Sequence, residues 1–128
     1  MALKRVVVTG LGALTPIGNN LDEFWTGLID GKSGAAPITY FDTEKFKTKF
    51  ACELKDFDIS LHLDRKQQRK MDRFTQYGMV STEEAIKDSG LGEKEVSNFM
   101  TGIVMGSGGP SIENVILAAD KTLSLIHI

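Results

Sequence analysis

Hydrophobic and polar positions follow two different periods along the chain, and the shorter one predicts three strands. Continuous runs of apolar and β-branched residues at 6–9 and 101–105 are typical of strands buried on both faces of a parallel sheet. Between them Phe50, Cys52 and Leu54 alternate with other residues at the period of a half-exposed strand. Cys52 falls on the predicted buried side. A structural thiol is expected there, because no histidine lies close in sequence to activate it.

The longer period, with apolar residues at i, i+3 and i+4, predicts three helices. The first is expected over 21–30, with Asn20 as its N-cap and Gly31 as its C-terminal cap. The second is expected over 64–88, with Asp64 as its N-cap, a break or fraying in its first turn, and its end before Gly90. The third is expected to begin at Pro110, a residue that suits the first position of a helix.

Strands and helices therefore alternate along the chain, and this order favours an α/β fold with a parallel sheet. Three strands make a thin sheet, and two of them require cover on both faces. The predicted fold is thus an incomplete α/β domain.

Composition and charge narrow the partners that the chain can have. The 128 residues include 15 Lys and Arg, 17 Asp and Glu, and 41% hydrophobic residues, which are values of a folded globular protein. The net charge of −2 provides no overall positive field for nucleic acid or an anionic membrane, so neither is an expected partner. No apolar run reaches the roughly 20 residues of a membrane span, and no signal peptide is evident. A cytoplasmic location is expected.

Neither a metal nor a nucleotide cofactor is expected from the motifs. Cys52 is the single cysteine, and the two histidines, His62 and His127, lack metal-ligand spacing. The glycines at 10–12 are followed by Thr15 where a dinucleotide fingerprint has its third glycine. The glycines at 106–109 lack the lysine of a phosphate loop and indicate a tight turn. A nucleotide-binding oxidoreductase fragment remains an alternative.

A dense basic run is the one local charge feature of the chain. On the predicted helix its cations share one face: Lys66, Arg69, Lys70 and Arg73. Met71 and Phe74 are predicted to turn toward the core. Such a patch suits an acidic partner, although the spacing alone favours a plain solvated face. A non-enzymatic module that binds an acidic protein through this helix is therefore a second alternative.

Several segments together resemble the beta-ketoacyl-acyl-carrier-protein synthases, in particular the synthase II branch of that family. The resemblance covers about residues 3–108 and is carried by the motifs VVVTGLG at 6–12, TPIG at 15–18, GKSG at 31–34, FDT at 41–43, KFA at 49–51, KDF at 55–57, RK-x-x-RKMD at 65–72, QYG at 76–78 and DSGL at 88–91. The resemblance implies a thiolase-like layered fold, of which residues 1–122 would be the N-terminal portion.

The resemblance implies an acyltransferase of fatty-acid elongation, which joins an enzyme-bound acyl chain to malonyl-acyl-carrier protein in a decarboxylative Claisen condensation. The family uses a cysteine nucleophile and two histidines. These lie beyond residue 122, and Cys52, His62 and His127 match none of them. No catalytic residue is assigned, and the chain by itself is expected to be inactive.

Two binding features also follow from the resemblance. The family docks the acidic helix of acyl carrier protein on cations that match Lys66, Arg69 and Lys70, which favours docking over a solvated face. The full-length enzymes are homodimers. The family also places an apolar gate of the acyl pocket after the motif at 106–108, where this sequence has Gly109.

Residues 123–128 depart from the rest of the pattern, because this apolar hexapeptide follows a helix without a cap or stop signal. Its codons can be written CTG TCT CTT ATA CAC ATC, a string that resembles the transposon end used to prepare DNA sequencing libraries. We interpret these residues as a non-native tail. The alternative is a natural strand that leads onward.

Overall fold

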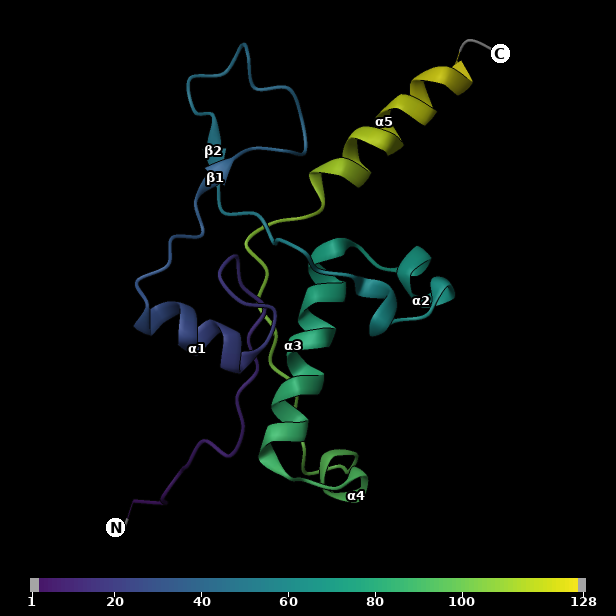
Figure 1. Ribbon diagram of the computed structural model, residues 1–128. Helices are drawn as coiled ribbons and strands as arrows, with labels where there is room; N and C mark the ends of the chain where they lie inside the picture. The colour runs from purple at the N-terminus through teal and green to yellow at the C-terminus, as the bar shows by residue number, and fades with distance from the viewer. Residues whose placement is uncertain (1–2, 127–128) are drawn as a thin grey trace.

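The computed structural model describes residues 3–126 and consists mainly of helices, with one small sheet (Figure 1). In chain order the elements are α1 Leu21–Ile29, β1 Ala36–Pro37, β2 Phe50–Ala51, the 3₁₀ helix η1 Ile59–Leu61, α2 Arg65–Lys70, α3 Arg73–Ser89, α4 Glu93–Val96 and α5 Ile112–Ile126.

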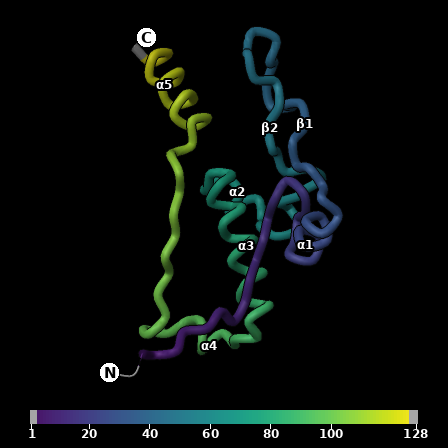
Figure 2. Tube along the Cα trace, turned by 90° about the vertical axis from the view of Figure 1, so that its left-hand side faces the viewer, coloured from purple at the N-terminus to yellow at the C-terminus, as the bar shows by residue number. Residues whose placement is uncertain are grey.

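Helix α3 lies at the centre, and the N-terminal segment, α2 and the segment before α5 are arranged around it (Figures 1 and 2). Its inner face carries Gln76 and Val80, which are buried and lie one turn apart. The helix ends at Gly90, whose φ of 67° is the left-handed conformation that favours glycine. The predicted end of this helix before Gly90 is confirmed.

The N-terminal segment lies directly against the backbone of α3, and two glycines permit this close approach. A Cβ atom added to Gly10 would lie 2.2 Å from the carbonyl oxygen of Ala85, and one added to Gly12 would lie 1.9 Å from that of Ser81. Any larger residue would therefore push the two segments apart. Helix packing, and not a bound pyrophosphate, accounts for these glycines.

Two carboxylates of α3 hold the same segment by hydrogen bonds. The Asp88 carboxylate accepts from the Leu11 backbone N–H at 2.8 Å. The Glu84 carboxylate accepts from the backbone N–H of Ala13 and of Leu21, each at 2.7 Å. Leu21 is the first residue of α1, so Glu84 fixes both ends of the loop between the extended segment and this helix. A negative charge at this helix N-terminus is also favourable for the helix dipole.

Helix α1 forms as its sequence predicts. The Asn20 side chain accepts a hydrogen bond from the Glu23 backbone N–H at 2.9 Å. Gly31 follows the helix with a φ of 64°. The Glu23 carboxylate accepts from the Asn19 backbone N–H at 2.8 Å, one residue before the position that the capping-box pattern predicts.

The helix predicted over 64–88 is two helices, because the chain becomes extended at Met71. The break was expected in the first turn of the helix, but that turn is intact and the break comes after Lys70. The Asp64 side chain and Gln67 form a complete capping box at the start of α2. At its end the buried Gln76 donates two hydrogen bonds of 2.9 Å from Nε2, to the carbonyl oxygens of Gln68 and Met71. These contacts satisfy carbonyl groups that the end of a helix leaves without a partner. Gln76 therefore stabilises the break and sets the position of α2 against α3.

The expected parallel sheet is absent from residues 3–126. Residues 6–9 and 101–105 are extended but pair with no strand in this part of the chain, and Val8 and Val104 are 78% and 98% exposed. The sheet that does form is the antiparallel pair of β1 and β2, with Ala36 opposite Ala51. β-branched composition favours an extended backbone, but a strand also requires a neighbour that supplies hydrogen bonds.

The face predicted to be buried in the middle strand is only partly correct. Leu54 is half-buried as expected, but Cys52 is exposed and Phe50 is 64% exposed, whereas Glu53 of the opposite face is half-buried. Hydrogen bonds hold Glu53 in this position. Its carboxylate accepts from the hydroxyl of Thr39 at 2.7 Å and from the Thr39 backbone N–H at 3.1 Å. The hydrogen bond from the Thr39 hydroxyl, with smaller backbone contributions, lowers the pKa of Glu53.

Helix α5 begins two residues later than predicted and stands apart from α3 in both views (Figures 1 and 2). Pro110, expected at the first position, lies outside the helix, and the Ser111 hydroxyl before the first turn accepts from the Asn114 backbone N–H at 3.3 Å. Residues 123–126 continue this helix, whereas 127–128 lie outside the described residues. The boundary between 1–122 and 123–128 stays a prediction. None of the helices in the described part of the chain has the length and apolar character needed to span a membrane.

We predict that Glu84→Ala frees the loop between residues 13 and 21. Hydrogen bonds to a charged group contribute about 1.5–3 kcal/mol each, so amide exchange of Ala13 and Leu21 should accelerate roughly tenfold or more. Hydrogen–deuterium exchange checks this, with Glu83→Ala as the control, because Glu83 pairs with Lys87 on the exposed side of the helix. Equal protection in the two variants would show that the loop is held by other contacts.

We also predict that Gln76→Glu separates α2 from α3. The substituted side chain has nearly the same shape but lacks the two N–H donors, and its negative charge faces two carbonyl oxygens. Gln67→Glu is a matched control, because Gln67 acts there as an acceptor from the Asp64 backbone N–H at 3.0 Å. Amide exchange across residues 68–70 should accelerate in the Gln76 variant alone. An unchanged exchange pattern would refute the role assigned to Gln76.

Candidate functional site

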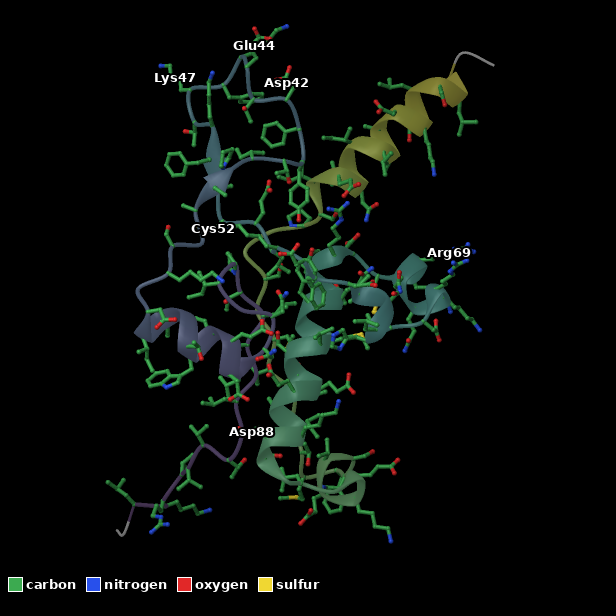
Figure 3. The ribbon with its side chains drawn as sticks, viewed as in Figure 1. Asp42, Glu44, Lys47, Cys52, Arg69 and Asp88 are labelled. Carbon is green, nitrogen blue, oxygen red and sulfur yellow. The ribbon has the colours of Figure 1, made fainter. Side chains whose placement is uncertain are left out.

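Three exposed cations on α2 form the candidate site, which we call the α2 patch: Lys66, Arg69 and Lys70. Figure 3 shows the Arg69 side chain directed away from α3. None of the three forms an ion pair with another residue among 3–126, so their charge is available to a partner. Arg69 and Lys70 lie in the last turn of α2, where positive charge also stabilises the helix dipole.

Arg73 was predicted on the same face as this patch, and the break between α2 and α3 separates it. Its Nε atom lies 3.9 Å from the Glu113 carboxylate at the start of α5. Its guanidinium carbon lies 5.2 Å from the centre of the Tyr40 ring, within the range of a cation–π contact. Arg73 therefore connects α3 with α5 and with the segment after β1.

Phe74 was predicted to turn inward, and this prediction is wrong, since the side chain is 44% exposed. Met71, predicted inward as well, is half-buried. The buried residue of this turn is Gln76, and a residue two positions away on a helix points roughly 200° around the axis. The hydrogen bonds of Gln76 thus decide which side of α3 faces inward and leave Phe74 outside.

A cleft of about 540 Å³ lies between the end of α2, the start of α3 and the start of α5. Arg69 and Lys70 line one side of it and Ser111 and Glu113 the other, while Phe74 forms part of its apolar lining. A polar contact from the Asn114 amide to the Asp72 carboxylate joins α5 to α3. The cleft combines positive charge with apolar surface.

A second, more apolar groove of about 1090 Å³ follows α3 on the side of the segment 103–108. Phe74, Met79, Ile86 and Ile103 are among its lining residues. The segment touches the helix where a Cβ added to Gly78 would lie 3.1 Å from the terminal carbon of Met105. Gly109 lies just beyond this groove, and a Cβ added there would meet no atom within 4 Å.

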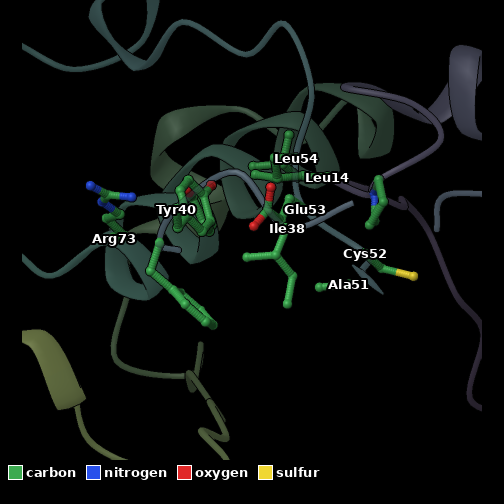
Figure 4. Close-up of a pocket in the computed structure, with 11 residues that line it drawn as sticks. Leu14, Ile38, Tyr40, Ala51, Cys52, Glu53, Leu54 and Arg73 are labelled. Carbon is green, nitrogen blue, oxygen red and sulfur yellow. The ribbon is translucent and has the colours of Figure 1, made fainter. Parts of the chain in front are cut away.

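A third pocket, of about 520 Å³, lies between the β1–β2 hairpin and α3 (Figure 4). Burial raises the pKa of Tyr77 in its wall, and the charge and hydrogen bond of Tyr40 add to this effect. The Cys52 sulfur points away from Tyr40 and Arg73 in this view.

The arrangement contains no cysteine–histidine pair among the described residues. Cys52 is exposed, and the His62 ring stacks on Phe57 with 5.5 Å between the ring centres. His127 lies outside the described part of the chain. No group of three or more potential metal ligands occurs within residues 3–126.

Comparison with sequence families and characterised proteins gives one consistent result. Residues 3–125 match the family described as beta-ketoacyl synthase, N-terminal domain. The 3-oxoacyl-[acyl-carrier-protein] synthase 2 of Synechocystis sp. is 46% identical over 105 residues, which are 82% of this chain and 25% of the relative. The synthase 2 of Coxiella burnetii is 46% identical over 84% of this chain and 26% of the relative. That of Staphylococcus aureus is 44% identical over 90% and 28%.

Solved structures agree with these relatives. The ishigamide ketosynthase/chain length factor superposes with a TM-score of 0.63 at 41% identity, over 72% of this chain and 23% of that protein. AntDE:AntF, a type II PKS acyl-carrier protein in complex with its ketosynthase, superposes with a TM-score of 0.52 at 32% identity, over 69% and 22%. The chain spans about a quarter of the length of the curated relatives it matches. Over nearly its whole length, the chain belongs to the beta-ketoacyl synthase family and matches the N-terminal domain of that family.

Proposed function

We propose that the chain forms the N-terminal part of a 3-oxoacyl-acyl-carrier-protein synthase, an acyltransferase of fatty-acid elongation. The reaction is the decarboxylative condensation of an enzyme-bound acyl chain with malonyl-acyl-carrier protein. The observation that carries this proposal is the 44–46% identity to synthases of that name over most of the chain. The same proposal places the protein in the cytoplasm and in a homodimer.

The chemistry assigns this part of the protein a binding role. Condensation requires a nucleophile for the acyl group and donors for the developing oxyanion. Cys52 is exposed and has no histidine partner in the described part of the chain, and His62 is stacked on Phe57. The reacting groups of the proposed enzyme therefore belong to the three-quarters of the relatives' length that this chain does not match.

The proposal includes the layered, thiolase-like α/β fold of the complete enzyme. The support is the state of the segments 6–9 and 101–105, which are extended, apolar and without strand partners among the described residues. Such segments are ready to join a sheet whose other strands come from the rest of the protein.

We propose acyl carrier protein as the partner of the α2 patch. Its three cations are exposed and free of ion pairs within the described chain. A chain with a net charge of −2 thus concentrates unpaired positive charge on one short helix. A related ketosynthase has been solved in complex with its own acyl-carrier protein.

For the acyl chain we propose that Gly109 occupies the position of the gate. It follows the apolar groove along α3, and it has open space around its Cα. A glycine presents no side chain to close a pocket, so the position would leave the acyl pocket open. Its neighbour Pro110 restricts the backbone on the following side.

Charge reversal tests the partner. A chimera in which residues 3–122 replace the matching segment of the Synechocystis synthase provides the complete enzyme. Each exposed ion pair contributes about 0.2–1 kcal/mol, so single substitutions should weaken carrier-protein binding only modestly. The triple variant Lys66→Glu, Arg69→Glu and Lys70→Glu replaces attraction by repulsion and should raise the Kd at low salt at least tenfold.

Titration calorimetry at low and high salt measures this effect, which should shrink as salt screens the charges. The control is Lys45→Glu, Lys47→Glu and Lys49→Glu, three exposed lysines whose reversal changes the net charge equally (Lys47 is labelled in Figure 3). If both triple variants bind equally well, the α2 patch is a plain solvated face.

Activity tests the enzyme assignment. We predict that the 128-residue chain releases no carbon dioxide from malonyl-acyl-carrier protein in the presence of an acyl primer, because Cys52 has no histidine partner among residues 3–126. The chimera should release carbon dioxide and form the elongated 3-oxoacyl product. Turnover by the isolated chain that Cys52→Ala abolishes would contradict the proposed division of roles.

A further inference from the structure

Phe74 is a large apolar side chain at the surface, beside unpaired positive charge, and the proposed function assigns it no task. It is 44% exposed, although it lies in the first turn of the central helix. It lines the cleft between α2, α3 and α5, whose other rim carries Arg69 and Lys70. An apolar surface and a charged rim thus belong to one concave feature.

Each of the two acidic side chains that line this cleft lies near a cation or an amide of the same chain. Glu113 lies 3.9 Å from Arg73, and Asp72 accepts a hydrogen bond from the Asn114 amide. Arg69 and Lys70 have no acidic partner within residues 3–126. The cleft therefore presents an excess of positive charge on the α2 side and apolar surface at Phe74.

We propose that Phe74 is the apolar anchor for the docking of acyl carrier protein. In this arrangement an acidic, amphipathic helix of the carrier protein lies across the end of α2. Its carboxylates meet Arg69 and Lys70, and an apolar side chain of the same helix enters the cleft against Phe74. A helix can present both kinds of side chain within one or two turns. The inference rests on the proposed function and adds to it the short-range contact that holds the partner.

The two parts of the surface should act differently. Exposed cations accelerate encounter and are screened by salt. A desolvated apolar contact acts only after encounter, through the dissociation rate, and is nearly independent of salt. Salt dependence therefore separates Phe74 from the three cations even though they belong to one surface.

The experiment compares Phe74→Ala with Met79→Ala in the chimera. Met79 is 38% exposed on the same helix but lies outside this cleft, so its loss removes similar apolar surface without touching the proposed contact. The probe is Synechocystis acyl carrier protein, and titration calorimetry at low and high salt gives its Kd. Phe74→Ala should raise the Kd roughly tenfold at both salt concentrations, and Met79→Ala less than about twofold. Phe74→Leu should retain most of the affinity.

A second measurement keeps the proposal falsifiable if Phe74→Ala does not fold. Fluorinated phenylalanine is incorporated into the chimera, and the signal of Phe74 is assigned from its absence in Phe74→Leu. This signal should shift when carrier protein is added, and an unshifted signal at saturation would overturn the proposal.

The remaining outcomes separate the two proposals. If the triple charge reversal weakens binding while Phe74→Ala and Met79→Ala behave alike, the docking proposal stands and the role of Phe74 is wrong. If the unmodified chimera does not bind carrier protein, both are wrong. A Phe74→Ala variant that converts a dimer into a monomer without changing the Kd would show that a second copy covers the cleft, which also overturns the inference.

Discussion

The hydrogen bonds of the Glu84 carboxylate are the constraint on which the arrangement of this chain depends. One side chain accepts from Ala13 and from Leu21, so it sets the distance between the end of the extended N-terminal segment and the start of α1. Gly10 and Gly12 can then lie on the α3 backbone without a steric clash. Glycines alone would leave this contact weak, because they bury little apolar surface. The charged hydrogen bonds supply the missing attraction and direct α1 to its position beside α3.

The buried amide of Gln76 has a comparable role at the other end of α3, with consequences for the surface. By donating to the carbonyls of Gln68 and Met71, it holds α2 at an angle to α3 instead of in line with it. An unbroken helix would have placed Arg73 beside Lys70 and Phe74 in the core. Because of the break, Arg73 instead contacts Glu113 and Tyr40. Phe74 is exposed next to the α2 patch. A single buried polar residue therefore determines both the charge distribution and the apolar character of the candidate docking surface.

Local signals were predictable from the sequence, whereas contacts distant in the chain were not. The Asn20 cap, the Asp64 cap and the glycine after α3 each act over a few residues, and the pattern indicates them directly. The break at Met71 depends on an amide five residues further on, and no hydrophobic period reports it. The position of Glu53 depends on Thr39, 14 residues away, and the alternation of residues 50–54 does not report this contact. The family resemblance supplied the function class, because motifs spread over the chain are specific as a set even where the predicted sheet does not form.

The buried polar groups of this chain have hydrogen-bond partners, whereas most of its large apolar side chains remain exposed to solvent. Within residues 3–126 no buried side-chain nitrogen or oxygen lacks a hydrogen-bond partner, so the polar contacts are satisfied locally. Little apolar surface is buried, since Leu63 and Val80 are the only large hydrophobic residues that are buried among residues 3–126. Val8, Val104 and Ile112 are all at least 72% exposed. Hydrophobic burial is the main favourable term in folding and grows with the area removed from water. Capping boxes and carboxylate contacts can therefore position the elements, but a stable layered core requires the apolar segments to be covered by further protein.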